Sequence, residues 1–190
     1  PIPYTSNDLN SKLIRGGENA IIHLSNELSQ LGNEVEVYNS NKNDCIINDV
    51  KWFNLSSTNK NSIYDVAFTN NDIRLFDNII ARKYVAFSHS IQTIEKFIRK
   101  GQLLSYLKYK PKIVLLSNYH SKNRNYLLKL FGTINLNWAV DPLFLKTELN
   151  ENLIENRAIF TSRRDRNLDM LIKLWIKEIF PKNKSVKLYT

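Results

Sequence analysis

Segments whose apolar residues have helical spacing alternate along this chain with short segments typical of strands. This alternation constrains the fold more than any other feature. Residues 20–31 carry apolar side chains at helical spacing; they follow the pair Gly16-Gly17 and end at Gly32. Residues 34–38 then alternate glutamate with valine or tyrosine, with the period of two that is typical of a strand. The sequence therefore predicts a helix, a glycine turn and a strand, which together make half of a βαβ unit.

The same alternation continues along the chain. Compact β-prone runs predict four more strands, at residues 50–55, 64–69, 83–88 and 112–116. Helical or irregular segments are expected between and after them, at 72–78, from 94 onward with a break at Gly101, and at 119–131. An asparagine-rich stretch at 39–48 is predicted to be a loop, and 134–140 to be extended. This order is typical of an α/β fold with a Rossmann-like, doubly wound parallel sheet, in which we expect at least five strands.

The polar stretch at 141–156 contains Pro142 and is typical of a connector between structural units. We predict a Rossmann-like domain over 1–147, a linker over 148–156 and a second α/β unit over 157–190. In that unit, strands at 158–161 and 186–189 flank a helical stripe of Leu168, Leu171, Trp175 and Ile179. A βαβ of about 34 residues is too small to bury both faces of its strands, so we expect an incomplete domain.

The formal net charge of +9 is unevenly distributed. Residues 96–129 contain nine lysines and arginines and no acidic residue, which suggests an anionic partner; a basic surface that serves only solubility is the alternative. A single cysteine, Cys45, excludes an internal disulfide. No apolar run approaches the roughly 20 residues that cross a bilayer. We therefore expect a cytoplasmic protein that can also contact an anionic membrane peripherally.

Gly16 and Gly17 stand where the first predicted helix begins. The first N–H groups of a helix have no partner within it, and the helix dipole is positive there, so such a position attracts phosphate. Two glycines also allow a ligand to approach the backbone closely. A plain loop has the same composition, so the pair by itself leaves both readings open.

Several motifs, in their order along the chain, resemble the glycosyltransferases of GT-B architecture, and among them the retaining enzymes of the family 4 type. The amino-terminal matches are a Gly-Gly-Glu loop, a helix that ends in Leu-Gly, a valine-rich strand, a strand that ends in histidine and a strand followed by serine: 16–18, 24–32, 35–38, 85–90 and 115–117. Residues 140–144 resemble the entry to the family's linker. Residues 160–169, with their Ser-Arg and Arg-x-Leu-Asp steps, are similar to its phosphate-clamping loop.

The resemblance implies a role for particular residues. Gly16 and Gly17 would face the donor diphosphate, His89 would lie near the reacting sugar, and Arg163 and Arg166 would clamp the donor phosphates. Further candidates for the cleft or the acceptor site are Glu18 and three residues that follow the carboxyl end of a predicted strand: Ser117, Tyr119 and His120.

The resemblance also implies an activity: transfer of a sugar from a nucleotide-diphosphate sugar to a glycan or lipid-linked acceptor, with retention of configuration and without a metal ion or cofactor. Residues 1–147 would be the acceptor-side domain, and 157–190 the first βαβ segments of the domain that binds the nucleotide sugar. The family's Glu-x7-Glu region is missing from these 190 residues. We therefore expect this length of chain to be inactive by itself.

A non-enzymatic α/β module is the alternative, in which residues 96–129 bind nucleic acid or anionic lipid through basic and aromatic side chains. No recognised nucleic-acid signature accompanies them, so no specific nucleic acid is expected. On a membrane, Ile94, Phe97 and Ile98 would form an apolar side, and Tyr106 and Tyr109 would anchor at the interface if they are exposed. The other reading places Ile94, Phe97 and Ile98 in the core of the domain.

Overall fold

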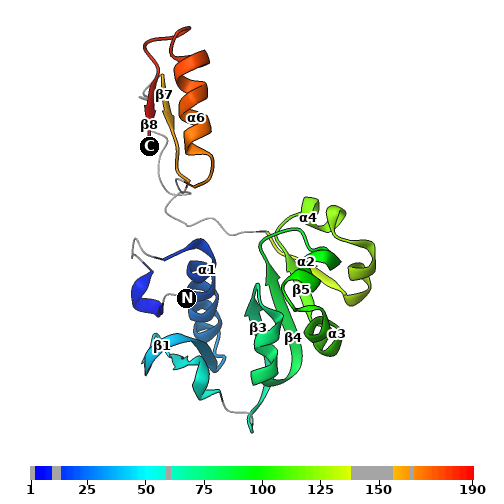
Figure 1. Cartoon of the computed structure of the whole chain (residues 1–190). Coiled ribbons are helices and arrows are strands. Elements are labelled where there is room, and N and C mark those ends of the chain that lie inside the picture. Colours follow the sequence, from blue (N-terminus) through cyan, green and yellow to red (C-terminus); the bar gives the residue numbers. More distant parts are fainter. Residues whose placement is uncertain (1–2, 10–13, 59–60, 138–155, 163–164) are drawn as a thin grey trace. The chain divides into compact units, whose positions relative to one another are not determined.

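The computed structural model describes residues 3–9, 14–58, 61–137, 156–162 and 165–190 (Figure 1). The chain forms two compact units, Pro1–Ala139 and Val140–Thr190. The predicted linker at 148–156 lies outside the described residues, apart from Asn156. None of the described helices is long and apolar enough to cross a membrane.

The first unit opens with a short 3-10 helix, η1 (Ser6–Asp8), and the long helix α1 (Gly16–Gln30). The predicted start of α1 at the glycine pair is confirmed. The residues that it buries are Ile22, Ser25 and Asn26, whereas the predicted apolar stripe is only partly buried and its last member, Leu31, is 78% exposed. Gly32 follows the helix in a left-handed conformation, with φ of 84°. Glycine adopts this conformation without a steric penalty, so the chain turns here towards the first strand.

The strands β1 (Val35–Ile47) and β2 (Val50–Asn54) form a sheet of their own. From Val35 to Asn39, β1 runs parallel to β2, whereas Cys45, Ile46 and Ile47 face Trp52, Lys51 and Val50 in reverse order. Between Ile47 and Val50 stand Asn48 and Asp49, both with positive φ, as in a two-residue hairpin turn. The predicted loop at 39–48 is therefore wrong, since most of it is strand.

Asparagine side chains explain why this stretch is ordered as strand. The side-chain nitrogen of buried Asn39 donates to the carbonyl of Tyr4 at 2.7 Å, and its oxygen accepts from the backbone N–H of Asn41 at 2.7 Å. The amide of Asn54 in turn donates to the carbonyl of Asn41. These side-chain amides therefore bond backbone N–H and C=O groups where β1 bends. In a polar loop, water would satisfy those groups instead.

Four strands form the second sheet of the first unit, all parallel and in the order β3-β4-β5-β6. They are β3 (Ile63–Asn70), β4 (Ile80–Ser88), β5 (Lys112–Leu115) and β6 (Thr133–Asn135). The coarse prediction of an α/β fold with a parallel sheet flanked by helices is confirmed, and the arrangement is compatible with a Rossmann-like fold. The expectation of five or more strands in one sheet is wrong, because β1 and β2 pair with each other and the described residues add neither to β3.

Helical segments connect and cover these strands: η2 (Leu55–Ser57), η3 (Ile73–Asn78), α2 (Ile94–Arg99), α3 (Leu103–Tyr109), α4 (Asn118–Asn123) and η4 (Tyr126–Phe131). The break at Gly101 between α2 and α3 occurs where it was predicted, again with positive φ. The single helix predicted at 119–131 is wrong. Arg124, with an extended backbone, divides it into α4 and η4.

The first unit has two hydrophobic clusters. One joins β3, β4 and β5 to η3, α2, α3 and η4, and its members include Phe76, Phe97, Tyr106 and Ile113. The other joins α1 to β1 and β2 through Ile22, Val37, Val50 and Trp52. Figure 1 shows the same division, with α1 beside β1 and with α2 and α3 beside β4 and β5.

Burial decides between the two readings of the segment that begins at residue 94. Phe97 and Tyr106 are buried in the larger cluster, and Ile94 packs against it, half-buried. Tyr109 is also half-buried, and its hydroxyl donates to Asp77 at 2.7 Å. The exposure that membrane anchoring requires is not met, since Tyr106 is buried and Tyr109 is half-buried, whereas Ile98 is exposed as that reading requires.

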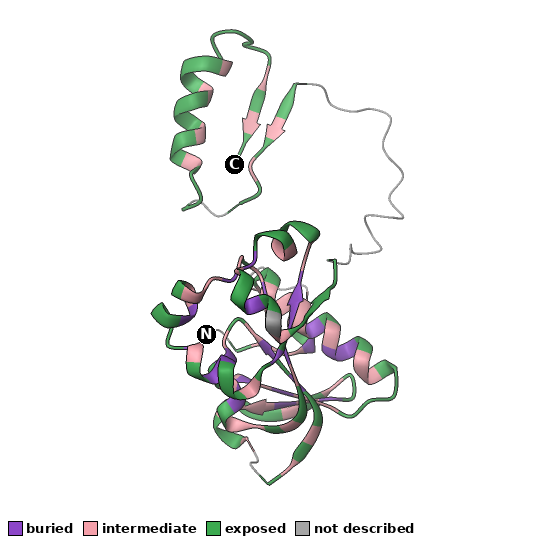
Figure 2. Ribbon diagram, turned by 90° about the vertical axis from the view of Figure 1, so that its right-hand side faces the viewer, coloured by how far each residue is buried: buried purple, intermediate pink, exposed green. Residues whose placement is uncertain are grey.

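The second unit is one βαβ: β7 (Arg157–Ile159), α6 (Leu168–Leu174), a π-helical turn η5 (Trp175–Ile179) and β8 (Lys187–Tyr189), with the two strands parallel. The predicted helical stripe is half-buried, while most of the side chains around it are exposed. Figure 2 shows no buried residue among the described residues of this unit. Its apolar side chains are therefore only partly covered by its own two strands.

Candidate functional site

The carboxyl ends of β3 and β4 place polar side chains next to one another. Asn70, the last residue of β3, stands beside Phe87 of β4, and the N–H of Asn71 donates to the carbonyl of Phe87 at 3.2 Å. The N–H of His89 donates to Oδ1 of Asn71 at 3.4 Å. In open α/β sheets this edge is where ligands bind, so these residues are the starting point for a site.

His89 is held by the side chain of Asn70. Its Nε2 lies 2.7 Å from Oδ1 of Asn70. Because an amide oxygen only accepts hydrogen bonds, Nε2 carries the proton in this orientation, and Nδ1 is the acceptor of the ring. The imidazole is half-buried. Its hydrogen bond to Asn70 fixes both the tautomer and the orientation of the ring.

Helix α1 begins directly against this pair of side chains. A Cβ atom added at Gly17 would lie 3.0 Å from Nδ2 of Asn70 and 3.9 Å from Nε2 of His89, whereas one added at Gly16 would have no atom within 4 Å. Gly17 therefore lies close to His89 at this edge of the sheet. A Cβ at this position would be in tighter contact than is usual, so the amide of Asn70 would have to shift by a few tenths of an ångström.

The start of α1 attracts negative charge. Arg15, at the N-cap, makes no side-chain capping bond. The first hydrogen bond of the helix runs from the N–H of Asn19 to the carbonyl of Arg15, at 2.9 Å. The N–H groups of Gly16, Gly17 and Glu18 precede that bond and have no partner within the helix. They present partial positive charge at the sheet edge, next to the carboxylate of Glu18.

His89 is neutral at pH 7. Burial lowers the pKa of its imidazole below the ordinary 6.5, the charge of Glu18 acts in the opposite direction, and His120 lowers the pKa further. Burial is the largest of these effects, so the net shift is downward. A neutral imidazole that donates to Asn70 through Nε2 is a hydrogen-bonding group at this edge of the sheet.

The remaining candidates from the sequence lie in different settings. Ser117 caps α4, and its hydroxyl accepts from the N–H of His120 at 3.3 Å. His120 is half-buried and interacts electrostatically with His89, whereas Tyr119 is exposed. Arg166 is exposed in the second unit, and Arg163 lies outside the described residues. The structure thus brings Gly17, His89 and His120 into one neighbourhood.

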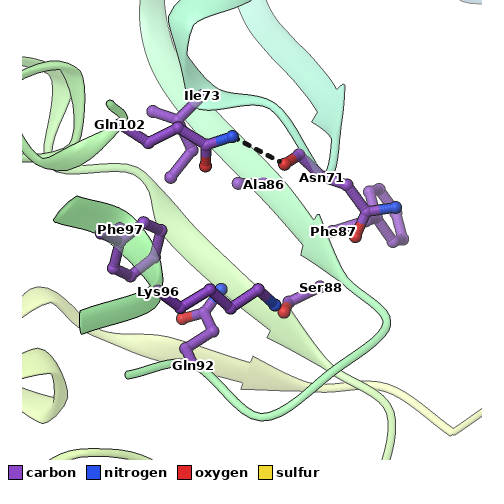
Figure 3. A pocket seen from close by; sticks show the side chains of 9 residues that line it. All are labelled: Asn71, Ile73, Ala86, Phe87, Ser88, Gln92, Lys96, Phe97 and Gln102. Atoms are coloured by element: carbon purple, nitrogen blue, oxygen red, sulfur yellow. Dashed lines mark hydrogen bonds between the residues drawn. The ribbon is translucent and has the colours of Figure 1, made fainter. Parts of the chain in front are cut away.

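Next to the same strand ends is a small cavity of about 20 Å³, which Figure 3 shows with its lining side chains. Gln102 donates to the carbonyl of Asn71 at 3.2 Å across it, and the ammonium group of Lys96 donates to Ser90. Gln92 is 5% exposed, and its Oε1 has no hydrogen-bond partner among the described residues. Since about 10–15 Å³ accommodates one water, this space suits a single small polar group.

Sequence reasoning missed Asn70 and Asn71, although each follows or ends a predicted strand. The rule that selected Ser117, a polar residue at the carboxyl end of a strand, applies to them equally. Gln92, Lys96 and Gln102 had no such signal. They reach the cavity from a loop and from the segments around α2 and α3, which only the folded chain brings together.

The N–H groups at the start of α1 and the polar side chains at this edge of the sheet are suited to a polar or anionic ligand. Within the described part of the chain, no group of three or more histidine, cysteine, aspartate or glutamate residues is placed to hold a metal ion. Family models, curated proteins and solved structures were compared with the chain, and none matches it. The functional argument therefore depends on the geometry of these residues.

Lowering the pH from about 7.5 to about 5.5 is expected to destabilise the first unit through His89. Because its pKa is lowered in the folded state, the unfolded chain takes up the proton first. Stability is complete above pH 6.5 and is lost as the pH falls towards the folded-state pKa. Urea unfolding of the parent and of His89→Gln at both pH values measures this effect. An equal loss of stability in the two proteins would contradict it.

Proposed function

We propose that the first unit is the acceptor-side half of a retaining glycosyltransferase of GT-B architecture. Such an enzyme transfers a sugar from a nucleotide-diphosphate sugar to a glycan or lipid-linked acceptor. One observation carries the proposal: Gly17, in the first turn of α1, lies against the Asn70–His89 pair at the carboxyl ends of β3 and β4. A sugar diphosphate needs a site for its anion next to a group that binds sugar hydroxyls, and this edge offers both.

Each residue of the edge then has a role. The N–H groups of Gly16 and Gly17 bind a donor phosphate, and the imidazole of His89 lies near the reacting sugar. Asn70 is a positioning residue, because it acts through the imidazole. Glu18 accepts from hydroxyls of the acceptor. In the proposal, the start of α1 offsets part of the charge that develops on the phosphate. The phosphate-clamping role of Arg163 and Arg166 stays a prediction from the resemblance.

Two alanine variants that differ by one position test the phosphate site. Gly17→Ala places a Cβ 3.0 Å from the amide of Asn70, which must move and disturb His89, whereas Gly16→Ala points into open space. We expect pyrophosphate and uridine diphosphate to shift the NMR signals of residues 16–18 and of the His89 ring in the parent protein and in Gly16→Ala. Binding to Gly17→Ala should be about tenfold weaker.

Circular dichroism of both variants verifies that the helices are intact. Gly16→Ala is the matched control, since it makes the same chemical change in the same helical turn. Absence of any shift with either phosphate compound, or equal weakening by the two substitutions, would contradict the proposed site.

The non-enzymatic alternative depends on nine basic residues at 96–129, and three of these are paired or buried. Of the nine basic residues at 96–129, Lys108 forms an ion pair with Asp77 at 3.0 Å, Lys96 is half-buried against Ser90, and Arg124 is buried. The exposed remainder is Arg99, Lys100, Lys110, Lys112, Lys122 and Lys129. Salt-dependent retention on heparin or on anionic vesicles, together with no response to pyrophosphate or uridine diphosphate, would favour this alternative.

A further inference from the structure

A second cavity, of about 220 Å³, lies between the β1–β2 sheet and the start of β3. Its lining consists of three aromatic rings, two carboxylates and two serines: Tyr38, Phe53, Tyr64, Glu36, Asp44, Ser57 and Ser62. Tyr64 and Asn70 are six residues apart on β3, which corresponds to roughly 20 Å along a strand. The cavity is therefore separate from the Asn70–His89 edge, at the other end of the same strand.

Hydrogen bonds inside the cavity use up its phenol donors. The hydroxyls of Tyr38 and Tyr64 donate to Oε2 of Glu36 at 2.7 and 2.6 Å, and they lie 2.9 Å from each other. Burial, together with these bonds, raises the pKa of Tyr38 far above its usual range, so its phenol stays protonated. The phenol and carboxylate oxygens can still accept hydrogen bonds, but the phenols have no further hydrogen to donate.

The charge of the lining is negative. Glu36 and Asp44 are carboxylates, and no lysine or arginine is among the described residues that line the cavity. Lys51 stands beside it, 3.8 Å from Oε1 of Glu36, but it is also paired with Glu34. Asp44 accepts from the N–H of Asn54 at 3.1 Å and has further lone pairs available.

Three aromatic residues form part of the wall. The rings of Tyr38 and Phe53 lie 5.4 Å apart and are tilted by 33° to each other, and Tyr64 joins them from β3. Ring faces carry partial negative charge and attract cations, most strongly where water is excluded. Carboxylates and ring faces in one small cavity thus favour the same kind of ligand.

We propose that this cavity binds a small organic ammonium ion. An ammonium group only donates hydrogen bonds, which matches a lining whose phenol donors are already committed to Glu36. Its positive charge complements the two carboxylates, and its alkyl carbons contact the aromatic rings. The inference does not depend on the glycosyltransferase proposal.

NMR titration with n-butylammonium chloride tests the site. We expect saturable shifts at the rings of Tyr38, Phe53 and Tyr64, and none with glucose or with sodium chloride at equal ionic strength. Asp44→Asn keeps the side-chain shape and its bond to Asn54 but removes a charge, so binding should weaken about tenfold. Phe53→Leu removes a ring from the wall and should weaken binding independently.

Asp65→Asn is the matched control, because Asp65 is the neighbour of Tyr64 on β3, is exposed and pairs with Arg82 at 3.0 Å outside the cavity. It should bind butylammonium as the parent does. Equal weakening by Asp44→Asn and Asp65→Asn would show non-specific charge attraction and overturn the proposal. Saturable shifts with glucose instead of butylammonium, or shifts with neither, would overturn it as well.

Discussion

Replacing Trp52 with alanine is expected to lower the free energy of unfolding of the first unit by about 3–5 kcal/mol, the cost of truncating a large buried aromatic residue. Trp52 on β2 is fully buried and packs with Ile22, Val37 and Val50. The ring of Tyr4 meets it edge-on, with centroids 5.9 Å apart. No other described side chain in this small cluster has comparable volume, so the remaining residues have little with which to fill the space.

Replacing Trp52 with phenylalanine separates the effect of side-chain volume from the effect of the indole N–H group. The indole N–H of Trp52 is buried without a partner among the described residues. Trp52→Phe loses part of the packing but also removes that unsatisfied donor, so its cost should be less than half that of Trp52→Ala. Urea unfolding followed by far-ultraviolet circular dichroism measures both variants. Equal costs for the two would contradict this account of the cluster.

Hydrogen exchange shows where the stability is lost. The two clusters of the first unit are distinct, and Trp52 belongs to the one under α1, β1 and β2. Protection should therefore fall most in those elements and least in β4 and β5. Trp175→Ala is a control for indole removal, since Trp175 is half-buried in the second unit. A uniform loss of protection across both sheets would show that the clusters unfold together.

Local patterns were sufficient to predict most elements. Helix α1 and the strands β2, β3, β4 and β5 follow from the spacing of apolar residues, because each buries one stripe or run against a neighbour. The extension of β1 through Asn39 and Asn41 was missed. It depends on hydrogen bonds to Tyr4 and Asn54, which are remote in the sequence, and asparagine otherwise favours loops.

The site was predictable only where one rule sufficed. Gly16 and His89 were expected on the same edge of the sheet, because each adjoins the carboxyl end of a predicted strand. The structure places the neighbouring Gly17 close to His89. The role of Asn70 as the partner of His89 needed the register between β3 and β4. The second cavity combines residues of three strands and the loops beside them, so no local pattern could have indicated it. The proposed sugar transfer stays a prediction from the resemblance and the geometry.

Arg124 is the clearest exception to the basic surface that the sequence suggests for residues 96–129. The sequence places it among nine basic residues of one segment, yet it is only 3% exposed. One guanidinium nitrogen donates to the hydroxyl of Tyr106, another lies 3.5 Å from the carbonyl of Gly132, and Nε has no partner among the described residues. Burial lowers the pKa of Arg124. The cation is thus held by neutral acceptors, an arrangement in which desolvation is costly.

A double-mutant cycle on Arg124 and Tyr106 should therefore show strong coupling. Tyr106→Phe keeps the buried ring but leaves the guanidinium without its best acceptor, at a cost of about 1.5–3 kcal/mol, as for other hydrogen bonds to charged groups. Arg124→Met removes the charge together with its desolvation cost, so it should destabilise less than Tyr106→Phe. In the Arg124→Met protein, Tyr106→Phe should cost almost nothing, because the hydroxyl then has no cation to bind. Additive effects in urea unfolding would mean that Arg124 obtains its stabilisation elsewhere.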